Sequence, residues 1–131
     1  MGSRTSREGA TTVITPWLSV RDAAAAVEFY RRAFGATTGE LAGSGGELQV
    51  GELFVDGARF WVQLDPDLPA DIDPGRAVRM IISVANPDAA FQRALGAGAV
   101  ALADVHDEGG WRSGRVVDPF GHQWEFAQPI G

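Results

Sequence analysis

A stretch near the C-terminal end organises the sequence, and it reads Asp118-Pro119-Phe120-Gly121-His122-Gln123-Trp124-Glu125-Phe126. The Pro119-Phe120-Gly121 segment favours a tight turn, and the residues after it alternate as a strand does. Alternation places Glu125 and Trp124 on opposite faces of this strand. Residues 55–62, where Asp56-Gly57 precedes an aromatic strand, are similar to this stretch in pattern.

The two halves of the chain repeat the same order of signals. A shift of 64 residues carries Asp22, which has the side chain of a helix N-cap, onto Asn86, which has one too. The same shift carries the turn glycine Gly57 onto Gly121. Strand and helix patterns recur as βαβββ, twice. The sequence therefore predicts an α+β fold made of two such modules.

Hydrophobic periodicity and turn residues predict one helix and four strands in each half. The first half is expected to form a helix at 23–34 and strands at 13–20, 37–42, 48–55 and 58–64. The second half is expected to form a helix at 88–95, ended by Gly96, and strands at 77–85, 100–106, 111–117 and 122–127. Asp56-Gly57 is typical of a type I′ turn between two strands.

These elements are expected to form one compact domain with four parts. Residues 1–12 carry no hydrophobic segment and are expected to be a disordered leader. Residues 13–65 make the first module, and residues 77–131 make the second. The intervening residues 66–76 are rich in proline and aspartate, which is typical of a linker.

The composition argues against several classes of protein. The chain has 131 residues and no cysteine, which favours a single domain without disulfides or thiolate chemistry. Its net charge of −6 argues against a nucleic-acid partner. No apolar run approaches the ~18 residues that a membrane helix needs, and no signal peptide is recognisable. We therefore expect a cytoplasmic protein without a membrane partner.

Several short stretches between residues 13 and 128 carry a resemblance to a known group of proteins. They are Val20-Arg21-Asp22, Glu28-Phe29-Tyr30, Phe34-Gly35-Ala36, Gly110-Trp111-Arg112, Gly114-Arg115 and the turn at 118–124. Together they resemble the vicinal oxygen chelate superfamily, which contains glyoxalase I, bleomycin-resistance proteins and extradiol dioxygenases. The Asp-Pro-Phe-Gly-His ending is most similar to its PhnB-like branch.

The resemblance implies curled mixed sheets, two modules around a cavity, and usually a homodimer. In metal-dependent members of the superfamily, the first and last strands of each module supply one ligand each, typically His or Glu. Carried over, these positions are Thr15, Trp61, Arg79 and Glu125. Only Glu125 is a good ligand, because Trp offers no lone pair and Arg is a cationic donor. We therefore predict no metal site and no cofactor.

Further aromatic residues are expected near the same cavity. Alternation places Trp17 and Gln63 on the face that carries Trp61, and Trp111 beside a glycine pair at the cavity mouth. The two indoles of Trp17 and Trp61 either fill the core or form a stacking platform for a planar ligand. Both interpretations stay open at the level of the sequence.

The charged residues allow two interpretations as well. Arg79 and Glu125 either orient a ligand through charged hydrogen bonds or close an empty cavity as an ion pair. We expect Arg112 and Arg115 either to line the approach to the cavity or only to be solvated, and His106 to be a surface residue.

These observations favour a binding protein over an enzyme. The predicted function is metal-free binding of a small, partly aromatic molecule by a homodimer, with sequestration of an antibiotic as one form of it. The alternative is a metal-dependent lyase, isomerase or dioxygenase whose ligands lie at other positions.

Overall fold

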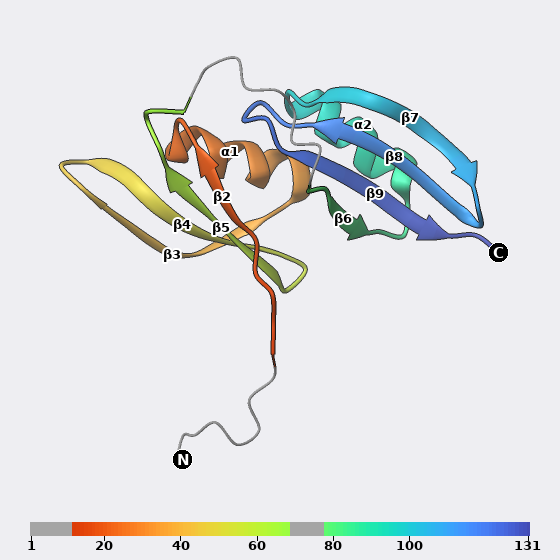
Figure 1. Ribbon diagram of the computed structural model, residues 1–131, viewed down its shortest axis with the longest axis horizontal. Helices are drawn as coiled ribbons and strands as arrows, with labels where there is room; N and C mark the ends of the chain where they lie inside the picture. Colours follow the sequence, from red (N-terminus) through yellow and green to blue (C-terminus); the bar gives the residue numbers. More distant parts are fainter. Residues whose placement is uncertain (1–11, 69–77) are drawn as a thin grey trace, which may run out of the picture.

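The computed structural model describes residues 12–68 and 78–131, so most of the expected leader and linker lie outside the described residues. The fold is α+β, with two four-stranded mixed sheets and two helices (Figure 1). Two βαβββ modules follow one another along the chain, as the sequence predicts. Within the described residues, neither helix is long and apolar enough to cross a membrane.

The first module contains one helix and a sheet of strand order β2-β5-β4-β3. Strand β2 runs parallel to β5, and the other neighbours are antiparallel. The elements are β2 (Trp17–Val20), α1 (Ala23–Phe34), β3 (Thr37–Ser44), β4 (Glu47–Val55) and β5 (Ala58–Leu64).

The second module repeats this arrangement with the strand order β6-β9-β8-β7. Its first strand, β6, runs parallel to its last strand, β9. The elements are β6 (Met80–Ser83), α2 (Pro87–Ala97), β7 (Val100–Glu108), β8 (Trp111–Val117) and β9 (Gln123–Pro129).

The pairing of the first and last strands confirms the internal repeat. Trp17 lies opposite Trp61 in the first sheet, and Ile81 lies opposite Glu125 in the second. Both partners of the second pair are shifted by 64 residues from those of the first, which is the spacing found in the sequence. The repeat is therefore a repeat of strand register as well as of residue type.

The helix starts and the first hairpin follow the predicted local chemistry. The Asp22 side chain accepts a hydrogen bond from the Ala25 N–H, and Asn86 caps α2 in the same way. At the turn between β4 and β5, Asp56 and Gly57 have φ angles of 48° and 85°. Positive φ at both positions is the signature of the type I′ turn.

Some element boundaries differ from those expected. Strand β2 begins at Trp17 rather than residue 13. Pro16 has no N–H to donate, and its carbonyl accepts from the Trp61 N–H at 3.0 Å, so pairing starts there. Helix α2 continues through Gly96, and Gly98 with φ 123° ends it instead.

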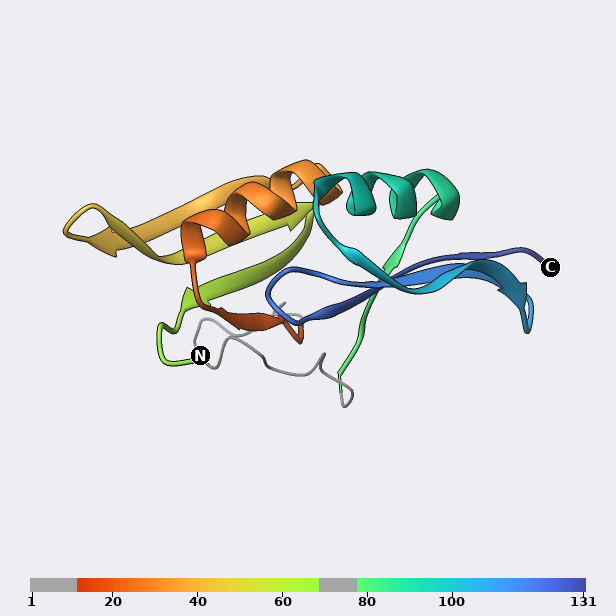
Figure 2. The same cartoon turned by 90° about the horizontal axis from the view of Figure 1, so that it is seen from above.

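Both helices cover the same side of the two sheets, and no helix or strand of the described residues covers the other side, which we call the open side (Figure 2). The core lies between helices and sheets and includes Leu53, Phe60, Val116 and Trp124. The residues that alternate with these, such as Trp61, point to the open side. The sheets are not closed into a barrel, so the residues of these open faces are accessible in a single chain.

A buried carboxylate, Asp118, ties the last turn to both modules. It is 4% exposed, and its Oδ2 accepts hydrogen bonds from the Tyr30 hydroxyl of α1 and from the Trp124 indole at 2.8 Å. Its Oδ1 accepts from the backbone N–H groups of Phe120 and His122, both at 2.9 Å. Four donors thus satisfy a charge that burial alone would strongly disfavour.

The turn also contacts the first sheet. The His122 Nε2 atom lies 3.0 Å from the Ser19 carbonyl oxygen of β2. Between the helices, the Arg93 Nε atom donates to the Arg32 carbonyl oxygen at 2.9 Å. Polar contacts therefore fix the junction on both the helix side and the turn side.

We expect Tyr30 to resist ionisation as long as the protein is folded. Burial first, and the Asp118 charge second, raise the pKa of Tyr30 well above its ordinary value. The pKa of Tyr30 is higher in the folded chain than in the unfolded chain. The stability that the protonated Tyr30 hydroxyl contributes is therefore complete below about pH 10 and falls as pH rises further. Tyr30 is the only tyrosine, and the chain has no lysine or cysteine. Tyrosinate absorbance therefore measures it alone.

In an alkaline titration, tyrosinate absorbance should appear only together with loss of the circular dichroism of the folded chain. The chain unfolded in urea is the control, and its tyrosine should ionise near the ordinary value of about 10. Reversible ionisation near that pH in the folded chain would show that the hydroxyl is not held by Asp118.

Candidate functional site

The open face of the first sheet carries an aromatic group that we name the tryptophan cluster, consisting of Trp17, Trp61 and Gln63. The two indole rings stack with centroids 5.4 Å apart and planes inclined by 25°. The Trp17 Nε1–H donates to the Gln63 amide oxygen at 2.7 Å. The cluster is therefore held in one arrangement, although Trp17 is 52% exposed.

Strand pairing explains why these side chains meet. The parallel register of β2 and β5 sets Trp17 opposite Trp61 and Ser19 opposite Gln63. The Arg59 guanidinium lies 6.0 Å from the Trp61 ring centroid, within the range of a cation–π contact. Both indoles lie outside the buried core, so they do not fill it.

The open face of the second sheet carries a polar hollow of about 200 Å³. Strands β7, β8 and β9 and the residue before β6 supply its lining, which is Arg79, Ala103, His106, Glu108, Ser113, Gly114, Arg115 and Glu125. Two of the predicted site residues, Arg79 and Glu125, lie here. The polar hollow is the second-module counterpart of the tryptophan cluster.

Two ion pairs lie within the polar hollow. Arg79 Nε is 3.1 Å from Glu125 Oε1, so the two residues meet as the sequence interpretation supposed. The Glu125 side chain is 18% exposed and that of Arg79 is 44% exposed, so solvent weakens the pair. His106 Nε2 is 3.1 Å from Glu108 Oε1.

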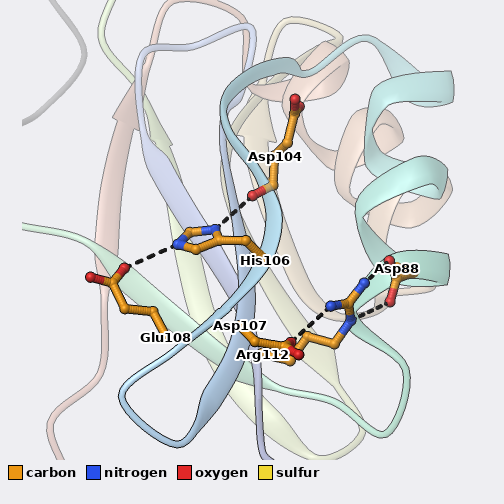
Figure 3. A network of polar contacts seen from close by, with 6 residues as sticks. All are labelled: Asp88, Asp104, His106, Asp107, Glu108 and Arg112. Carbon is orange, nitrogen blue, oxygen red and sulfur yellow. Dashed lines mark hydrogen bonds and ion pairs between the residues drawn. The ribbon is translucent and has the colours of Figure 1, made fainter.

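His106 has two acceptors and no donor among its ring contacts (Figure 3). Its Nδ1 lies 2.9 Å from the Asp104 carbonyl oxygen, and its Nε2 faces the Glu108 carboxylate. Both contacts are hydrogen bonds at once only when both ring nitrogens carry protons. The Asp104 carbonyl first, and Glu108 next, accordingly raise the pKa of His106 above its ordinary value.

The remaining predicted site residues are less central. Thr15 precedes β2 and belongs to no strand, so it lies beyond the paired part of the sheet. Trp111 begins β8 opposite Glu108 and is 48% exposed. The structure thus brings five of the seven predicted residues together in two groups, one on each sheet.

Arg112 does not line the approach to the cavity as expected. Its guanidinium pairs with Asp88 of α2 and with Asp107, each at 2.8 Å, and therefore lies on the helix side (Figure 3). Alternation along β8 puts its neighbour Ser113 on the open face. Arg115 shares that face and lines the polar hollow.

Sequence reasoning missed His106, Glu108 and Ser113 as lining residues. The expected strand ended at His106 and so left out Glu108. Strand β7 instead continues to Glu108, which puts both side chains on the open face two residues apart. Extending the alternation across the hairpin, where His106 pairs with Ser113, would have found them.

The four positions implied for a metal do not fit an ion. Trp61 has no lone pair to offer, and the Arg79 guanidinium already engages Glu125. Within residues 12–68 and 78–131, no three His, Asp or Glu side chains are grouped as metal ligands. The donor chemistry at these positions therefore supports hydrogen bonding and ion pairing.

Paired βαβββ modules with an open sheet face define a recognised class of proteins, and this chain is similar in sequence and in fold to known proteins of that class. A family model described as a glyoxalase-like domain matches residues 15–127. The chain belongs to this glyoxalase-like family.

Individual proteins are similar to the chain in sequence or in fold. An uncharacterized protein of Mycobacterium bovis is 39% identical in an alignment 128 residues long, and the match covers 89% of this chain and 83% of the relative. The fosfomycin resistance protein FosX of Listeria monocytogenes has a similar fold, with a TM-score of 0.73 at 14% identity, covering 92% of this chain and 94% of FosX. A PhnB protein of Bacillus cereus gives a TM-score of 0.69 at 18% identity, covering 89% and 99%.

The charge state of His106 gives a direct test of the polar hollow. We expect a pKa above the ordinary histidine value in the folded protein, and a lower pKa in the Glu108→Gln variant. The stabilisation that protonated His106 gains from the Asp104 carbonyl and Glu108 is complete below about pH 6.5. It is lost as pH rises through the pKa of His106 in the folded protein. Proton NMR can follow both histidines of the chain separately.

The control variant is Asp104→Asn, because only the backbone carbonyl of Asp104 contacts the ring. It should change the pKa of His106 less than Glu108→Gln does. An unshifted His106 in the wild-type chain would show that the imidazole does not make these contacts in solution.

Proposed function

We propose that this protein binds a small, partly aromatic molecule without a metal ion. The stacked tryptophan pair, of which Trp17 is 52% exposed, carries the proposal. An indole left in water offers a large apolar face, and an aromatic ligand that covers it gains burial and ring contacts. The hydrogen bond from Trp17 to Gln63 holds the platform ready, so little side-chain entropy is lost on binding.

A second copy of the chain is proposed to complete the cavity. The open faces expose Trp17, Ile81 and Trp111, which are 52%, 58% and 48% exposed. Exposed apolar side chains that gather on one side of a protein mark interaction surfaces. A homodimer with these faces covered would enclose the ligand between sheets.

Antibiotics are one class of ligand that this proposal includes. FosX, which shares the fold, is named as a fosfomycin resistance protein. Sequestration of an antibiotic would need only the platform and a cavity closed by the second copy of the chain. The Arg79–Glu125 pair would orient polar groups of the ligand.

One observation favours a second candidate, a metal-dependent enzyme with ligands at unexpected positions. Glu125, His106 and Glu108 line the same polar hollow, and all three are residue types that bind divalent metals. Such an enzyme would have to separate both existing ion pairs before these groups could bind a metal.

Tryptophan fluorescence can test the binding proposal. Titration with bleomycin and a panel of other aromatic antibiotics should give saturable quenching with at least one compound. Trp61→Ala should weaken that binding by about tenfold or more, because half of the stacked platform is lost.

Val100→Ala, at an exposed position of the outer strand β7, is the matched control and should bind as the wild-type chain does. If no compound quenches saturably, or if Trp61→Ala binds as tightly as the wild type, the tryptophan cluster is not the ligand site.

A further inference from the structure

We propose that the polar hollow binds a carboxylate, so that the ligand class is planar aromatic molecules with one carboxylate group. The inference rests on the proposed function, in which the two open faces share one cavity. The tryptophan cluster would take the ring, and the polar hollow would take the charge.

The ion pairs of the polar hollow leave one cation without a partner. Glu125 pairs with Arg79, and Glu108 pairs with His106. Among the described residues, no carboxylate lies within ion-pair distance of Arg115. This holds although Arg115 is directly opposite Glu125 in the strand register. One anionic group from a ligand would therefore balance the charge of Arg115.

The surroundings of Arg115 leave room for that group. Its cross-strand neighbour on the other side is Ala103, whose small side chain keeps the polar hollow open. Arginine presents a planar fork of donors that matches the two oxygens of a carboxylate. The Ser113 hydroxyl lies on the same lining and can donate to one of these oxygens.

The two glutamates of the polar hollow select the charge of the ligand. A doubly charged phosphate would lie near both Glu108 and Glu125, and each would repel it. A cationic ligand would meet Arg79 and Arg115 instead. A single negative charge is the value that one unpaired guanidinium can balance.

Calorimetric titration at pH 7 tests this selection with matched probes. The probes are benzoate, 1-naphthoate and indole-3-acetate, each compared with its own uncharged primary amide. In the wild-type chain, at least one acid should bind saturably and about tenfold more tightly than its amide, as expected for a hydrogen-bonded charge.

The variants assign the preference to one side chain. Arg115→Gln should remove the preference for the acid, and Arg115→Lys should retain part of it. Arg21→Gln is the control. Arg21 is exposed, and this substitution removes the same charge at a site outside the polar hollow. It should leave the preference unchanged.

Three outcomes would overturn the inference: acids and amides binding equally, Arg115→Gln keeping the preference, or no acid binding saturably. Failure of the proposed function looks different, because Trp61→Ala would then leave the binding of acids and amides alike unchanged. If Trp61→Ala weakens both probe types equally and no acid preference exists, the aromatic site stands and the carboxylate site falls.

Discussion

The fold of both modules depends on one buried carboxylate, that of Asp118. A charge removed from water is costly unless donors surround it. Here two backbone N–H groups of its own turn, one indole of β9 and one phenol of α1 supply them. The arrangement fixes where β9 starts and which way it faces, and it ties that strand to a helix of the other module. The position of Glu125 in the polar hollow follows from it.

A repeated backbone carries two different surfaces. Strand register relates Trp61 of the first sheet to Glu125 of the second, yet one belongs to an aromatic platform and the other to an ion pair. The helix faces differ much less, because both must fill a close-packed core. The open faces are free of that constraint, and their chemistry therefore carries the information about the ligand. Membership of the glyoxalase-like family identifies the architecture, and the side chains of the open faces limit the classes of ligand that fit.

Local chemistry made much of the fold predictable from the sequence. N-cap residues, the Asp56-Gly57 turn and two-residue alternation predicted the helix starts, the first hairpin and the shared face of Trp17, Trp61 and Gln63. The contact between Tyr30 and Asp118 joins residues 88 positions apart, and no local pattern reports it. Strand ends were also hard to place, because β7 continues into residues that resemble a turn, and Glu108 was missed for that reason.

The most direct test of metal-free binding is a comparison of one protein preparation in two states. Protein purified without chelator would be analysed for bound metal, and its affinity for the tightest aromatic compound would be measured before and after dialysis against EDTA. We expect far less than one metal ion per chain and the same dissociation constant in both states. A stoichiometric metal, or binding that disappears with EDTA and returns with Zn²⁺, Ni²⁺, Fe²⁺ or Mn²⁺, would contradict it.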